Sequence, residues 1–216
     1  MAASGIAETV MKIKIPKLGN IGLLLHIIKV PPDGSCFFHS ILRAFYREYI
    51  EAETKDYRIN LVKKLRSSLS EALEEKNEYT NISEYDTLGN GYYKKFNEAI
   101  KMVDGDTHSL ESLQIELKSN NPVDHSYIEI LSNHLNLDIY LISSKTGDVY
   151  LTGTDRQLLY KNRKSIVILY SPGHYDIIGL KRKPNQNGII IFDTLFSCDH
   201  DLILAIKGRI NHLVKE

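Results

Sequence analysis

Segments typical of β-strands are concentrated in the second half of the chain, and this uneven distribution constrains the fold most. The stretch Leu137–Ile142 is rich in β-branched and aromatic residues, which favours a strand. Four more short apolar segments follow it, separated by turn-type residues, at 149–151, 165–170, 174–178 and 188–192. Helical patterns dominate the rest of the chain, so we expect an α+β fold in which helices surround a largely C-terminal sheet.

Apolar residues at steps of three and four predict several helices. One helix is expected over residues 56–76, with a buried stripe of Ile59, Val62, Leu65, Leu69 and Leu73. Shorter helices are expected over 92–103, 110–117 and the stretch that begins near Tyr127. A terminal helix is expected over 201–214.

Residues 12–30 are rich in Ile, Leu and Val and are broken at Gly19-Asn20, so they predict two strands or a hairpin. The second strand would run from about Leu23 to Val30. Pro31-Pro32-Asp33-Gly34 then forces a loop, because proline cannot donate to a strand ladder. The apolar residues from Phe37 to Tyr49 again follow helical spacing, which puts Cys36 at a helix N-terminus.

A cysteine at a helix N-terminus is a candidate nucleophile. The unpaired amides and the positive end of the helix dipole both favour the thiolate of Cys36. The amides of Cys36 and of the turn Asp33, Gly34 and Ser35 are candidate donors to the oxyanion formed when sulfur attacks a carbonyl. We also expect Gly34 to allow close approach of a substrate backbone, because it has no side chain.

The best partner for this nucleophile is His174, which follows the turn Ser171-Pro172-Gly173 at the start of a predicted strand. Residues two apart in a strand project to the same face, so Asp176 is expected beside the imidazole. Such a carboxylate holds the ring in one tautomer and stabilises the imidazolium. The sequence therefore predicts a catalytic group of Cys36, His174 and Asp176.

Other readings of the polar residues are weaker. Asp33 is a second candidate for the acid, but we expect its carboxylate to cap the Cys36 helix. His39 lies one helical turn from Cys36 and is a reserve base. Cys198 and His200 are only two potential ligands without a second pair, so we expect no metal site there.

The composition excludes several classes of protein. Lysine plus arginine number 27, as do aspartate plus glutamate, so bulk charge would not hold the chain on nucleic acid or on an anionic membrane. The longest apolar runs are shorter than the roughly 20 residues that span a bilayer, and the first residues lack the basic start of a secretion signal. Two cysteines are too few for a disulfide scaffold. We expect a monomeric, single-domain protein of the cytoplasm.

Three segments together resemble the ovarian-tumour (OTU) family of cysteine proteases. Residues 33–41 (DGSCFFHSI) resemble the nucleophile motif of that family, and residues 174–176 (HYD) resemble its C-terminal His box. Residues 127–142 are similar to the helix and strand between the two motifs. The resemblance covers about residues 23–178. It departs from the family pattern at Ser35, where asparagine is common, and at His39, where arginine is common.

This resemblance implies a papain-like OTU fold, with a central, mostly antiparallel sheet flanked by helices. The strands in 12–30 and an extension over 189–216 would be elaborations of a single catalytic domain spanning residues 1–216. It also implies a deubiquitinase that acts through a thioester on ubiquitin, on polyubiquitin or on a ubiquitin-like modifier, without metal or cofactor. A viral origin, with action in the host cytoplasm, is compatible with it.

The alternative from a different class is a catalytically silent ubiquitin-binding module of the same fold. Acidic loop residues Glu84 and Asp86 are candidates to bind the arginines that precede the two glycines of the ubiquitin tail.

Overall fold

A computed structural model describes residues 8–19, 21–73, 109–123, 127–151, 162–182 and 191–214. A central sheet has the strand order β1-β2-β6-β5-β3-β4, and β7 pairs with β6 in addition. The strands are β1 (Val10–Lys12), β2 (Leu25–Ile28), β3 (Asp138–Ser143), β4 (Asp148–Tyr150), β5 (Ser165–Ser171), β6 (His174–Lys181) and β7 (Phe192–Asp193). The pair β3 and β5 is parallel and every other described pair is antiparallel, which confirms the expected α+β fold with a mostly antiparallel sheet.

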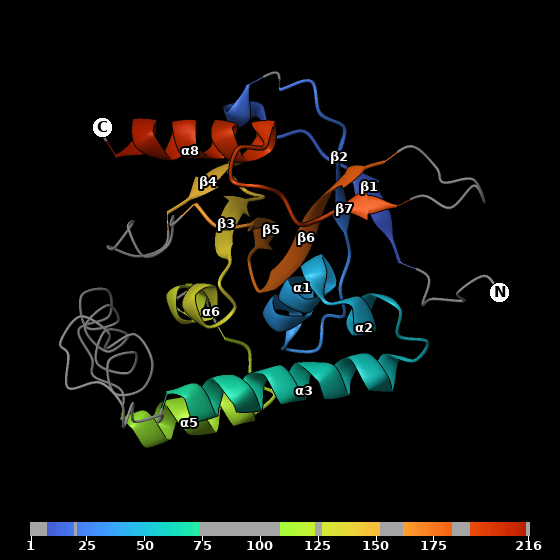
Figure 1. The fold of residues 1–216 in the computed structure, drawn as a ribbon, viewed down its shortest axis with the longest axis vertical. Helices are drawn as coiled ribbons and strands as arrows, with labels where there is room; N and C mark the ends of the chain where they lie inside the picture. The colour runs from blue at the N-terminus through green and yellow to red at the C-terminus, as the bar shows by residue number, and fades with distance from the viewer. Residues whose placement is uncertain are drawn as a thin grey trace.

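Helices cover both faces of this sheet (Figure 1). They are α1 (Cys36–Phe45), α2 (Arg47–Ile50), α3 (Lys55–Ala72), α5 (Leu110–Lys118), α6 (Ile128–His134) and α8 (Asp201–Leu213), with a 3-10 turn η1 (Pro16–Leu18). Figure 1 shows α8 at one end of the view and the pair α3 and α5 at the other, with the sheet between them. In the described part of the chain, no helix combines the length and the hydropathy that a membrane crossing requires.

Alternation along the central strands divides the core into two layers. Ile139 and Leu141 of β3 pack in the layer that contains α1, α3, α5 and α6. Tyr140 and Ile142 of the same strand pack in the layer that contains η1 and α8. Because strand side chains point to opposite faces in turn, a strand that is buried on both faces is apolar at every position. This explains the continuous apolar stretches that predict β3 and β5.

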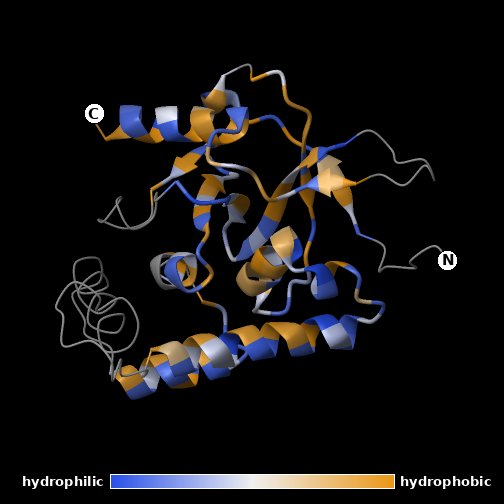
Figure 2. Ribbon diagram, viewed as in Figure 1, coloured by the Kyte–Doolittle hydropathy of each residue, from blue (hydrophilic) through white to orange (hydrophobic). Residues whose placement is uncertain are grey.

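Helix α1 lies at the centre of the first layer and is buried along nearly its whole length. Figure 2 shows it largely in the colours of hydrophobic residues. The ring of Phe37 lies 5.0 Å from that of Tyr175 on β6, so the helix rests directly on the strand that begins with His174. This packing brings the two predicted motifs together.

The N-terminal segment agrees with its expectation in part, and the Cys36 helix differs from it. Strands β1 and β2 form an antiparallel pair as expected, but β1 begins at Val10, β2 begins at Leu25 and η1 lies between them. The single helix expected through Tyr49 is wrong, because Tyr46 is extended and separates α1 from α2. This break turns the chain so that buried Tyr49 packs back on α1, where its hydroxyl lies 2.6 Å from Nδ1 of His39. Helical spacing alone does not reveal such a break.

The other described predictions agree with the structure to within a few residues. The helix expected over 56–76 is α3, and the terminal helix is α8. His200, considered above as a metal ligand, caps α8, because its Nδ1 accepts the amide of Leu202 at 3.2 Å. The helix expected over 92–103 lies outside the described residues.

Candidate active site

Cys36 is the first residue of α1 and its side chain is 6% exposed. The turn before it depends on Gly34, which has a φ of 80°. A Cβ atom at this position would lie 2.5 Å from the carbonyl oxygen of Asn120. Glycine is therefore required because another loop of the same chain packs against the turn, whereas the sequence suggested room for a substrate.

Asp33 organises this turn through its carboxylate, although its side chain is 29% exposed. Its Oδ1 accepts the amide of Ser35 at 3.1 Å, and its Oδ2 accepts the Nε2–H of His39 at 3.0 Å. The expectation that Asp33 caps α1 is wrong, because Ser35 occupies the N-cap position. Since the Ser35 amide is already bound to Asp33, Gly34 and Cys36 are the better candidate oxyanion donors in this turn.

His39 is poorly placed to act as the reserve base. Its side chain is fully buried and both ring nitrogens are bound, one to Tyr49 and one to Asp33. Burial lowers the pKa of His39, and the neighbouring Asp33 carboxylate opposes this effect. The residue joins α1, α2 and the turn at Asp33 in one buried network, which is a structural role.

The thiol of Cys36 lies against the backbone at the start of β6. Burial raises its pKa, and this effect exceeds the opposing one of hydrogen bonds from the amides of Tyr175, Phe37 and Cys36 itself. Tyr175 immediately follows His174, so the backbone that contacts the sulfur adjoins the predicted base in the chain. A thiol whose pKa is raised by burial needs a partner that removes its proton at neutral pH.

The structure places Asp176 beside the ring of His174, as the two-residue repeat of a strand predicts. The Nε2–H of His174 donates to Oδ1 of Asp176 at 3.0 Å, because a carboxylate can only accept. The side chain of His174 is 23% exposed and that of Asp176 is 1% exposed. The neutral ring therefore carries its proton on Nε2, which leaves Nδ1 as an acceptor.

Two further groups hold the Asp176 carboxylate, and both come from the end of β2. The backbone amide of Val30 donates to Oδ1 at 3.2 Å, and the ammonium group of Lys29 donates to Oδ2 at 2.7 Å. Sequence reasoning missed both residues. Pairing of β2 with β6 brings Ile28 opposite Ile177 and so carries Lys29 to Asp176, a register that no local pattern in the sequence reveals.

Arg66 of α3 is a second group that sequence reasoning missed. It is 1% exposed, and its guanidinium donates to Oγ of Ser35 at 3.0 Å and to the carbonyl of Asn121 at 3.0 Å. It also donates to the carbonyls of Leu117 and Glu116 at the end of α5. Arg66 thus ties the turn before Cys36 to the loop that follows α5. Its position four residues after the buried Val62 was the available signal.

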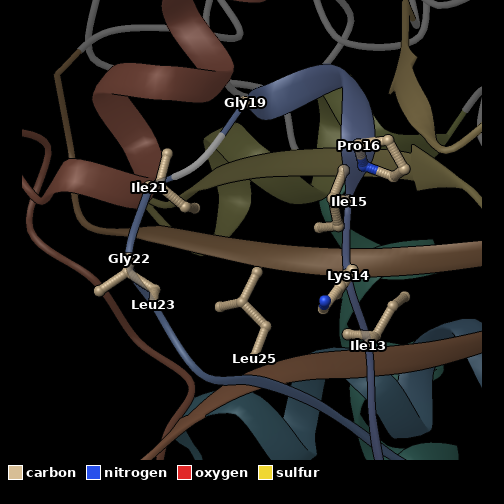
Figure 3. A pocket seen from close by; sticks show the side chains of 9 residues that line it. All are labelled: Ile13, Lys14, Ile15, Pro16, Gly19, Ile21, Gly22, Leu23 and Leu25. Atoms are coloured by element: carbon tan, nitrogen blue, oxygen red, sulfur yellow. The ribbon is translucent and has the colours of Figure 1, made fainter.

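One hollow in the described residues lies away from Cys36, His174 and Asp176. It has a volume of about 710 Å³ and lies between the two arms of residues 13–25 (Figure 3). Leu25 at its edge pairs with Leu180, toward the opposite end of β6 from His174. A second hollow, of about 530 Å³, includes Tyr170 and Pro172 of the turn that leads into His174. Glu84 and Asp86 lie outside the described residues, so their predicted contacts stay a prediction.

Comparison with known proteins gives one family match and several similar structures. A family model described as OTU-like cysteine protease matches residues 31–176, which include every predicted catalytic residue. No curated protein sequence matches the chain significantly. A solved OTU domain in complex with ubiquitin is similar over 100% of this chain and 96% of its own, with a TM-score of 0.54 and 17% identity. This likeness confirms the predicted OTU fold.

Two viral structures were also matched. The OTU of Hazara virus bound to ubiquitin covers 82% of this chain and 91% of its own, with 16% identity and a TM-score of 0.43. The OTU domain protease of Taggert virus covers 85% of this chain and 91% of its own, with 15% identity and a TM-score of 0.45.

Proposed function

Because the chain belongs to the family of OTU-like cysteine proteases, we propose that it is a deubiquitinase. It hydrolyses the peptide or isopeptide bond after the C-terminal glycine of ubiquitin or of a ubiquitin-like modifier. The observation that carries this proposal is the hydrogen bond of 3.0 Å between Nε2 of His174 and Asp176, on the strand that also contacts the Cys36 thiol.

The catalytic cycle follows from the assigned proton positions. Nδ1 of His174 takes the proton of the Cys36 thiol, and the sulfur attacks the carbonyl carbon of the terminal glycine. Amides of Cys36 and Gly34 donate to the oxyanion, and the imidazolium returns its proton to the leaving amine. A water molecule then gives one proton to His174 as its oxygen attacks the thioester carbon and the sulfur leaves. The imidazolium returns that proton to the sulfur, which restores the thiol, and the released acid ionises to the carboxylate.

Asp176 contributes by holding the imidazole and by stabilising its charged form. It is almost fully buried and already accepts three hydrogen bonds, so its orientation is fixed before substrate arrives. Ubiquitin is the expected partner because an OTU domain of similar fold has been solved in complex with ubiquitin. We further propose that one domain carries the activity, and that it acts as a monomer in the reducing cytoplasm, where both free cysteines stay thiols.

The test is reaction with ubiquitin that carries an electrophile at its C-terminus. Wild-type protein should gain the mass of one ubiquitin, and peptide mapping should find the new bond at Cys36. The Cys36→Ala variant should gain nothing, whereas Cys198→Ala should react like the wild type, because Cys198 lies in the turn before α8 and is not part of the proposed site. Binding of ubiquitin without any adduct would identify the chain as the silent ubiquitin-binding module instead.

A further inference from the structure

The contacts of the Asp176 carboxylate are divided between its two oxygens. Oδ1 accepts from the ring of His174 at 3.0 Å and from the amide of Val30 at 3.2 Å. Oδ2 accepts from Nζ of Lys29 at 2.7 Å. All three partners are donors, so both side-chain oxygen positions of residue 176 must be hydrogen-bond acceptors.

We propose that Lys29 is a positioning residue that makes the active site dependent on aspartate at position 176. An asparagine of the same shape has one acceptor oxygen and one NH₂ group. If the amide oxygen faces His174 and Val30, the NH₂ group faces the ammonium of Lys29, and two donors meet. If the amide is reversed, its NH₂ group faces the imidazole and the amide of Val30, and the ring loses the acceptor that orients it.

Of the three donors to Asp176, Lys29 is the one that can be changed by mutation to test this dependence. The carboxylate is 1% exposed, so water does not readily relieve a donor that has no acceptor. The amide of Val30 belongs to the backbone, and His174 is needed for the reaction. Lys29 is 40% exposed and follows the last residue of β2, so its side chain can be changed without altering the buried core.

The inference rests on the proposed function for the roles of Cys36 and His174. Its experiment therefore uses a readout that does not require ubiquitin. A small haloacetamide alkylates thiolates, and mass spectrometry of the peptides gives separate rates for Cys36 and Cys198. The rate at Cys36 reports proton removal by His174, and the rate at Cys198 is the internal reference.

A double-mutant cycle tests the dependence directly. In the presence of Lys29, Asp176→Asn should slow alkylation of Cys36 by a large factor. The Lys29→Met background keeps the length of the side chain but removes its donor. In this background, the fold-decrease in the Cys36 alkylation rate caused by Asp176→Asn should be at least about ten-fold smaller. Lys29→Arg retains a donor and should keep the full penalty. Lys64→Met, at an exposed position of α3, is the matched control and should leave the penalty unchanged.

An Asp176→Asn penalty that is the same within about two-fold with Lys29 intact and in the Lys29→Met background would overturn the proposal. Thermal unfolding of each variant shows whether a loss of rate reflects a loss of folded protein. For hydrolysis of ubiquitin, the penalty should appear in kcat with KM little changed, since Lys29 acts through Asp176. If Lys29 and Asp176 are coupled in alkylation but ubiquitin is not hydrolysed, the positioning role of Lys29 is supported and the deubiquitinase proposal is rejected. If ubiquitin is hydrolysed but the two residues are not coupled, the deubiquitinase proposal is supported and the positioning role is rejected.

Discussion

At the scale of single residues, the burial of Cys36 determines how its thiol behaves. Burial raises the pKa of the thiol, and amide hydrogen bonds only partly offset this. The helix N-terminus, which the sequence pattern suggests is activating, is therefore not sufficient by itself. The thiolate must form by transfer of its proton to a neighbouring base.

The pH dependence of Cys36 alkylation should reveal that base. In the wild type the rate should already be high near pH 7, because His174 accepts the proton. In His174→Ala the thiol titrates alone, so its raised pKa keeps it protonated at neutral pH. We expect the rate at pH 7 to fall about 100-fold and to continue rising into alkaline solution. Superimposable profiles for the two proteins would argue against His174 as the base.

The sequence points to candidate catalytic residues but not to their neighbours. Cys36 and His174 lie in short motifs, and Asp176 follows from the strand repeat alone. Lys29 and Val30 contact the site through strand pairing, which leaves no local pattern in the sequence. Arg66 contacts it through helix packing, for which its position four residues after Val62 was the only signal. The meaning of Gly34 was also missed, because it depends on the carbonyl of Asn120.

At the scale of elements, α3 supports the turn that precedes α1. The two helices are joined through Arg66, whose guanidinium lies over the ring of Phe38 and binds Ser35 together with three carbonyls. Burial lowers the pKa of Arg66, which reflects the cost of removing this cation from water. The cost is offset only while all of these acceptors are in place.

Arg66→Met should therefore destabilise the protein and disturb the active site together. Removing the donors leaves several buried oxygens without partners, and we expect the free energy of unfolding to fall by about 3 kcal/mol or more. Denaturant unfolding measures this change. Arg47→Met is the control, since Arg47 forms an exposed pair with Glu51 and should cost less than about 0.5 kcal/mol. Equal effects of the two substitutions would contradict the role given to Arg66.

The sequence predicts most of these elements because their apolar spacing is regular. The places where it fails are those where tertiary contacts override the pattern. Tyr46 interrupts a continuous helical stripe so that Tyr49 can reach His39, and η1 interrupts a run expected to form strands. The break at Tyr46 is not marked by proline or glycine, whereas η1 begins at Pro16 and is followed by Gly19.

At the scale of the whole molecule, the sheet is stable only if both of its faces are covered. The side chains of Leu202, Ile203 and Ile206 on α8 are fully buried in the layer opposite α1. From the sequence, residues 189–216 are expected to be an extension of the catalytic domain. The burial of α8 indicates that this extension supplies part of the core.

Ile206→Ala should consequently destabilise the entire fold, although it is far from Cys36 in sequence. Loss of a fully buried isoleucine typically lowers the free energy of unfolding by about 2–5 kcal/mol. Leu204→Ala on the same helix should change it by about 0.5 kcal/mol or less, because Leu204 is 51% exposed. If the chain is one domain, both variants should unfold in a single transition by circular dichroism and by intrinsic tyrosine fluorescence. Separate transitions would indicate that α8 folds independently.

The central claim is that Cys36 is the nucleophile of a ubiquitin hydrolase, and the presence of two cysteines allows a direct test. The measurement is the rate at which the protein releases a fluorescent amine from the C-terminus of ubiquitin. We predict that Cys198→Ala matches the wild type and that Cys36→Ala shows no release above background while remaining folded. Release by Cys36→Ala at the wild-type rate would contradict the account.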